Sequence, residues 1–109
     1  MNVRFSDRAV RCRVTRAELD RLLSGRAVSL DLALPRDHWF RVNVRPAALN
    51  GWQLDSDPTG LWLAIPRSEL QELAQSLPDK QGIRQSFDTS AGEIIAVTFE
   101  VDVEDETSA

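Results

Sequence analysis

Apolar and polar residues alternate along most of this chain, and such alternation is typical of β-strands that bury one face. Four predicted strands fall in the first half, at residues 3–5, 10–14, 28–34 and 39–45. Four more fall in the second half, at residues 52–54, 61–65, 83–87 and 94–103. Turn-forming residues separate them, most densely at residues 55–60. We therefore expect an α+β fold of about eight mostly antiparallel strands.

Two short helices interrupt these strands. The first begins with a capping box, in which the Thr15 hydroxyl and the Glu18 carboxylate accept hydrogen bonds from otherwise unpaired N–H groups. It ends at Gly25, because glycine adopts the left-handed conformation that closes a helix. The second begins with Pro66, which suits the first helical position, and Pro78 prevents its extension. Leucines at helical spacing give each helix one apolar face.

The same order of elements occurs twice. Four residues of the first helix, Arg16, Glu18, Leu19 and Leu22, match Arg67, Glu69, Leu70 and Leu73 of the second. Each half reads strand, strand, helix, strand, strand, which predicts pseudo-duplicated halves at about 1–46 and 50–104. Convergence is the alternative, because capped amphipathic helices tend to place glutamate early and leucine three residues apart. The eight strands then form either a rolled sheet or a barrel.

The length of 109 residues and the 42% share of apolar residues predict a single domain, 1–109, with one core and a frayed tail at 105–109. No apolar run approaches the roughly 18 residues of a membrane span, and no signal peptide begins the chain. We therefore expect a cytoplasmic protein that does not enter a membrane.

The chain has a net charge of -4, and its charged residues are distributed unevenly along the sequence. Residues 1–45 hold ten arginines against five acids, and residues 46–109 hold three bases against twelve acids. The favoured interpretation is neutralisation across neighbouring strands, with Glu100, Asp102 and Glu104 pairing with arginines of the first hairpin. The acidic balance disfavours a nucleic-acid partner.

Residues for catalysis are sparse. Cys12 alternates with valines and is expected to be a buried small hydrophobe. His38 lies at a strand start, where a lone histidine is usually solvated. With one histidine and one cysteine the common zinc patterns are excluded, and no nucleotide or hydrolase motif occurs. We expect no metal, no cofactor and, on balance, no enzyme.

The candidate binding residues are strand residues that share the polar faces: Arg11, Arg13, Arg41, Arg45, Trp39 and Trp62. Arginines beside large aromatics are typical of partner surfaces and of anion sites. The favoured function is a protein-interaction or homodimerising module, and the alternative is a small domain that binds an anion or phosphate ligand. The more ordinary interpretation of the tryptophans is secondary core beneath helices or loops.

The stretches at residues 10–19 and 65–70, with Gly82 and Ile83 after them, resemble a family of small bacterial proteins catalogued only as a domain of unknown function. That resemblance implies a size and an element order, with no activity to carry over. A remoter likeness is to the triphosphate tunnel enzymes, whose barrel is also a duplicated unit of strands and helices. Here no Glu-x-Glu-x-Lys stretch stands near the start, and Lys80 is the only lysine.

Overall fold

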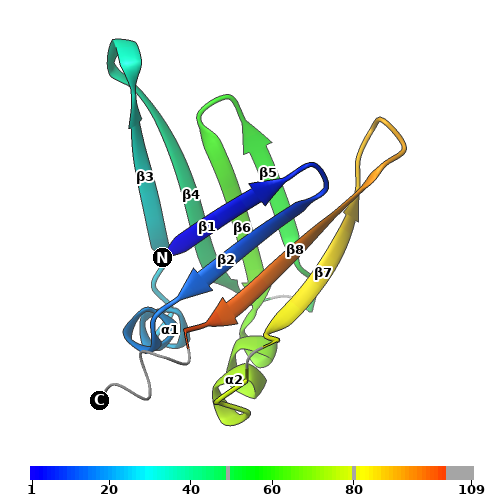
Figure 1. Cartoon of the computed structure of the whole chain (residues 1–109). Coiled ribbons are helices and arrows are strands. Elements are labelled where there is room, and N and C mark those ends of the chain that lie inside the picture. Colours follow the sequence, from blue (N-terminus) through cyan, green and yellow to red (C-terminus); the bar gives the residue numbers. More distant parts are fainter. Residues whose placement is uncertain (49, 80, 103–109) are drawn as a thin grey trace.

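The computed structural model describes residues 1–48, 50–79 and 81–102, and in these ranges the alternating segments form eight strands (Figure 1). The strands of the first half are β1 (Asn2–Ser6), β2 (Ala9–Val14), β3 (Val28–Leu34) and β4 (His38–Ala47). Those of the second half are β5 (Gln53–Asp57), β6 (Gly60–Pro66), β7 (Ile83–Asp88) and β8 (Ile94–Val101). The helices are α1 (Arg16–Leu23) and α2 (Arg67–Gln75).

The described strands form two four-stranded sheets and not a closed barrel. Sheet A has the order β1-β2-β8-β7, and sheet B has the order β3-β4-β6-β5. The outer pairs of each sheet are antiparallel hairpins, as predicted. The two central pairs, β2 with β8 and β4 with β6, are parallel. Strands far apart in the chain meet there, so no turn signal in the sequence marks these two pairs.

Each sheet combines one hairpin from each half, and the two sheets repeat the same hairpin register. Val3 lies opposite Cys12 in sheet A, and Leu54 lies opposite Leu63 in sheet B. The predicted repetition of strand, strand, helix, strand, strand is therefore present in the order of the elements.

The parallel centres of the two sheets also share a register. Val10 lies beside Val97 in sheet A, and Leu61 lies beside Val42 in sheet B. Most residues of one sheet thus have a structural counterpart in the other, except at the ends of strands that differ in length. We call two such residues pseudo-equivalent.

The core lies between the inner faces of the two sheets and under the two helices. Its fully buried members include Cys12, Val44, Leu63, Ile65 and Phe99 from the central strands. Both helices lie at one end of the sheets, where they contact each other, and the tips of the hairpins lie toward the other end (Figure 1). Neither helix of the described ranges has the length and apolarity that a membrane span requires.

The helix starts differ in detail. The Thr15 hydroxyl accepts a hydrogen bond from the Glu18 amide at 3.1 Å, and the Glu18 carboxylate accepts one from the Thr15 amide at 3.0 Å, which confirms the capping box. Pro66 instead ends β6 and precedes the first helical residue, and it makes no side-chain cap.

The turn expected at residues 55–60 is shorter than predicted. Asp55, Ser56 and Asp57 continue β5, because Trp62, Leu61 and Gly60 of β6 pair with them. Backbone pairing here outweighs the turn preference of aspartate and serine. The predicted end of the last strand at residue 103 and the predicted frayed tail lie outside the described residues.

Candidate functional site

Three of the six predicted site residues meet on the outer face of sheet B, the face turned away from sheet A. Trp39 and Arg41 are alternate residues of β4, and Trp62 of β6 lies beside the next outward residue of β4, Asn43. Together they line a hollow of about 670 Å³, whose other lining residues are Asp31, Leu34, Asp37, His38, Pro58 and Thr59.

The two tryptophans of this hollow differ in exposure. Trp39 remains 59% exposed, so its expected burial beneath a helix or loop is wrong. The residue lies near the free end of the β3–β4 hairpin, whereas the helices cover the opposite end of the sheets (Figure 1). Trp62 is half-buried, because it lies on a central strand between β4 and β5.

Arg41 is already engaged by a carboxylate. Its Nε and Nη2 donate to Oδ1 and Oδ2 of Asp31 at 2.7 Å and 3.0 Å, in the fork geometry that arginine favours. Asp31 lies directly opposite Arg41 on β3. The hydrogen bond from Arg41 holds the pKa of Asp31 below its ordinary value, and the same bond raises the pKa of Arg41. The pair therefore adds no net charge to the hollow.

The four predicted arginines do not share one face. Arg41 and Arg45 lie on sheet B, and Arg11 and Arg13 lie on sheet A. Residue alternation placed each on a polar face, but it carried no information on which sheet each strand joins.

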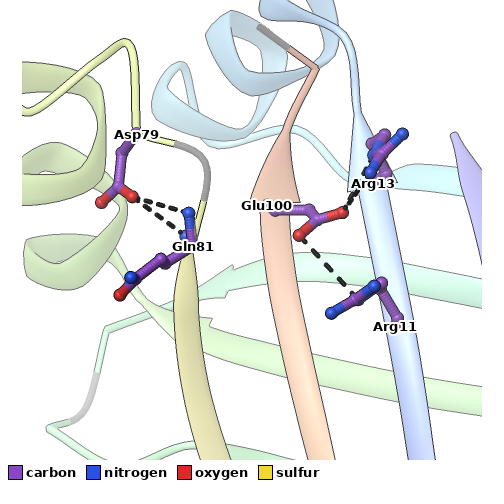
Figure 2. A network of polar contacts seen from close by, with 6 residues as sticks. Arg11, Arg13, Asp79, Gln81 and Glu100 are labelled. Carbon is purple, nitrogen blue, oxygen red and sulfur yellow. Dashed lines mark hydrogen bonds and ion pairs between the residues drawn. The ribbon is translucent and has the colours of Figure 1, made fainter.

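Arg13 and Arg11 both approach Glu100 on the outer face of sheet A (Figure 2). Nε and Nη2 of Arg13 lie 2.9 Å from Oε1 of Glu100, and Nε of Arg11 lies 3.9 Å from Oε2. Glu100 is only 4% exposed. The expected pairing of the last strand with the first hairpin is confirmed for Glu100, and Glu104 lies outside the described residues.

A close backbone approach helps to bury Glu100. A β-carbon at Gly82 would lie 2.8 Å from the Glu100 β-carbon and 2.3 Å from the Phe99 carbonyl oxygen, so only glycine fits there. Gly82 also has a φ of +71°, which glycine adopts without strain. The turn before it is held by Asp79, whose Oδ1 accepts hydrogen bonds from the Gln81 and Gly82 amides at 2.8 Å and 3.3 Å (Figure 2).

A second hollow, of about 440 Å³, lies on sheet A. Arg4, Arg11, Thr98 and Arg84 form one cross-strand row along it, with one residue from each strand of the sheet. Sequence reasoning missed Arg4 and Arg84. Each lies at a polar position of an alternating strand, but the parallel pairing of β2 with β8 is what brings them into one row.

The inner face of β3 is apolar but largely uncovered. Of its apolar residues only Val28 is buried; Leu30, Leu32 and Leu34 are 37%, 56% and 41% exposed. They lie on the same face as Phe40, which contacts the ring of Phe5 edge-on with centroids 6.4 Å apart. These leucines thus extend the core surface toward the free end of the hairpin.

The one cysteine and the one histidine of the chain differ in exposure. Cys12 is buried, as predicted, and burial raises the pKa of its thiol to about 11. A thiol of this kind is protonated near neutrality and is a poor nucleophile. His38 is exposed at the rim of the sheet B hollow. Residues 1–48, 50–79 and 81–102 contain no group of three or more histidine, cysteine or acidic residues arranged to hold a metal.

Residues 1–107 match the model of a protein family described as a family of unknown function (DUF7009). No curated protein matches the chain. The match includes the stretches 10–19 and 65–70, so the resemblance of those residues to a domain of unknown function is confirmed. Neither finding supplies an activity.

Proposed function

Since the chain belongs to this family of unknown function, we propose from its geometry that it is a self-associating interaction module in which β3 pairs with β3 of a second copy. The observation that carries this proposal is the exposure of Leu30, Leu32 and Leu34 along a strand at the edge of sheet B. Contiguous exposed apolar side chains on a folded protein mark interaction surfaces.

The outer edge of β3 is available for strand pairing. Among the described strands β3 pairs only with β4, so its other edge presents unpaired N–H and C=O groups. Natural proteins protect such edges with lysine, proline, bulges or inward-pointing charges. The seven residues Val28–Leu34 contain neither lysine nor proline, and their register with β4 runs without a bulge.

The pseudo-equivalent edge strand of sheet A, β7, is protected. Leu30 lies beside Val42, and its pseudo-equivalent Gln85 lies beside Val97. The outward positions of β7 also carry Arg84 and Asp88, so this edge is polar and charged. The two edges share a backbone arrangement. Only β3, however, carries the apolar side chains that are typical of a strand covered by another strand.

The side chains of β3 are complementary to themselves. Antiparallel pairing about a two-fold axis at Leu32 places Leu32 opposite its own copy and Leu30 opposite Leu34. The same register places Asp31 opposite Ala33, so no two carboxylates face each other. A second copy of the chain therefore fits this edge, and the two B sheets become one continuous sheet.

Trp39 provides a reporter. It lies directly opposite Ala33 on the neighbouring strand, one strand away from the proposed contact. Its exposed ring should therefore become less accessible to a soluble quencher when two copies pair.

The proposal is tested by sedimentation and acrylamide quenching of the intact chain between about 1 and 100 μM, a range that brackets micromolar association. The wild-type protein should become dimeric, and Leu32→Glu should remain monomeric because it buries opposed carboxylates on the axis. Gln85→Glu, on the protected edge, is the matched control and should dimerise like the wild type. Leu32 is more than half exposed, so the variant should keep the wild-type circular dichroism. A monomeric wild type, or a dimeric Leu32→Glu, would overturn the proposal.

A further inference from the structure

We infer that the outer face of sheet A binds a small phosphoryl oxyanion at the row formed by Arg4, Arg11, Thr98 and Arg84. The row crosses all four strands, because Arg4 lies opposite Arg11, Arg11 beside Thr98, and Thr98 opposite Arg84. It lines the hollow of about 440 Å³ on this sheet.

The row concentrates positive charge that the protein itself does not balance. Arg4 and Arg84 form no ion pair with any residue that the structure describes. Arg11 reaches Glu100 only at 3.9 Å, and Arg13 occupies the other oxygen of that carboxylate at 2.9 Å. Like charges directly opposite each other destabilise a sheet, and an anion between Arg4 and Arg11 would relieve that repulsion.

The hollow exists because the neighbouring row has small side chains. Ser6, Ala9, Ala96 and Ser86 lie side by side across the four strands, next to the arginine row. Their short side chains leave space on the sheet surface that the longer arginines border. A volume of about 440 Å³ is within the usual range for small-ligand sites.

The donors suit a phosphoryl group. Guanidinium groups bind phosphate oxygens through paired hydrogen bonds. Neighbouring strands bring the backbones of Arg4 and Arg11 about 5 Å apart, and Arg84 lies two strands beyond Arg11, on the other side of Thr98. The Thr98 hydroxyl makes no hydrogen bond with the described residues, so it is available as a further donor. Three cations and one hydroxyl favour a multiply charged oxyanion over a single carboxylate.

Sheet B supplies an internal control. The pseudo-equivalent row consists of Asp55, Trp62, Asn43 and Ser29, and it contains no cation. Within it, Asn43 donates to the Ser29 hydroxyl at 2.7 Å. The backbone arrangement is thus common to both sheets, and the proposed anion site depends on the side chains of sheet A alone.

The first test is thermal melting of the full chain with inorganic phosphate, pyrophosphate or sodium chloride at matched ionic strength. Binding to the folded state stabilises by mass action, and saturating pyrophosphate should raise the melting temperature by about 5 °C above the chloride control. An equal shift in chloride would overturn the proposal. Phosphate and pyrophosphate then distinguish one bound phosphoryl group from two.

The second test locates the site by titration calorimetry with pyrophosphate. Arg4→Gln and Arg84→Gln should each weaken binding about tenfold or more, since a charge-assisted contact is lost. Both side chains are exposed and without ion pairs to described residues, so these variants should fold normally. Arg45→Gln on sheet B should leave binding unchanged. Unchanged affinity in both sheet A variants, or tighter binding of a single-stranded oligonucleotide than of pyrophosphate, would overturn the small-anion site.

Discussion

The outer faces of sheet A and sheet B share a register but have opposite chemistry. Three outward residues of sheet A, Arg11, Arg13 and Glu100, have Trp62, Ala64 and Arg45 as pseudo-equivalents in sheet B. Sheet A thus presents a basic row and a buried carboxylate, and sheet B presents an aromatic hollow in which Arg41 is neutralised by Asp31.

The inner faces of the two sheets differ much less. Val10, Cys12 and Val14 of β2 have apolar pseudo-equivalents at Leu61, Leu63 and Ile65 of β6. Burial against a shared core accepts only apolar side chains of suitable volume, whereas an outward position carries no such restriction. The difference between the sheets therefore locates the proposed binding functions on their outer faces and exposed edges.

The largest expected effect tests how closely the two backbones correspond. A β-carbon at Gly60 would lie 2.1 Å from the Arg41 carbonyl oxygen, whereas the pseudo-equivalent residue is Ala9, which has that carbon. Gly60→Ala should lower the free energy of unfolding by about 3 kcal/mol, because rigid backbone must move. Ala9→Gly should cost only about 1 kcal/mol. Urea denaturation measures both, and similar losses would show that the tight approach is absent.

The second expected effect is a pH dependence of stability, which Cys12 can cause and its pseudo-equivalent, Leu63, cannot. The folded pKa of Cys12 is raised to about 11, so the stability contributed by its neutral thiol is complete below the unfolded pKa, near 9. Between these two pKa values the Cys12 thiol ionises in the unfolded chain before it ionises in the folded one. The free energy of unfolding should therefore fall by about 2–3 kcal/mol as pH rises. The chain has no tyrosine and one lysine, so few other groups titrate there. Urea denaturation between about pH 8 and pH 11 measures how the free energy of unfolding depends on pH. Cys12→Ala should flatten this dependence, and an unchanged slope would contradict the prediction.

A smaller effect concerns the buried carboxylate of sheet A. Glu100→Gln removes the charge that Arg13 and Arg11 share, and it should lower stability by about 1–2 kcal/mol in low salt and by less in high salt. The loss is modest because both arginines are about half exposed to solvent. Arg45→Gln at the pseudo-equivalent position should change the melting temperature little. Equal effects at the two positions would mean that the pairing does not stabilise sheet A.

The smallest effect compares the helix starts. Thr15→Ala removes the side-chain cap of α1 and should cost about 1 kcal/mol. The pseudo-equivalent position in α2 is Pro66, which makes no side-chain hydrogen bond, so Pro66→Ala should cause no capping loss. Thermal melting of both variants checks the difference. A stability loss in Thr15→Ala that Thr15→Ser does not restore would point to packing and not to the hydroxyl.

Much of the candidate site was predictable residue by residue. Alternation placed Trp39, Arg41 and Arg45 on one face of their strand, and placed Arg11 and Arg13 on the polar face of theirs. It did not predict which residues would meet. Trp62 and Arg41 line one hollow because β4 and β6 pair in parallel, and Arg84 and Arg11 line another because β2 and β8 do.

Local sequence decided the elements, because alternation, the capping box at Thr15 and the turn residues act over a few positions. It also indicated the repeat, since the helix starts at Thr15 and Pro66 carry matching residues after them. Tertiary structure alone decided that the hairpins of the two halves join into two sheets with parallel centres. Those contacts join residues far apart in the chain, such as Arg13 and Glu100, which are 87 positions apart, and no local preference encodes such a pairing.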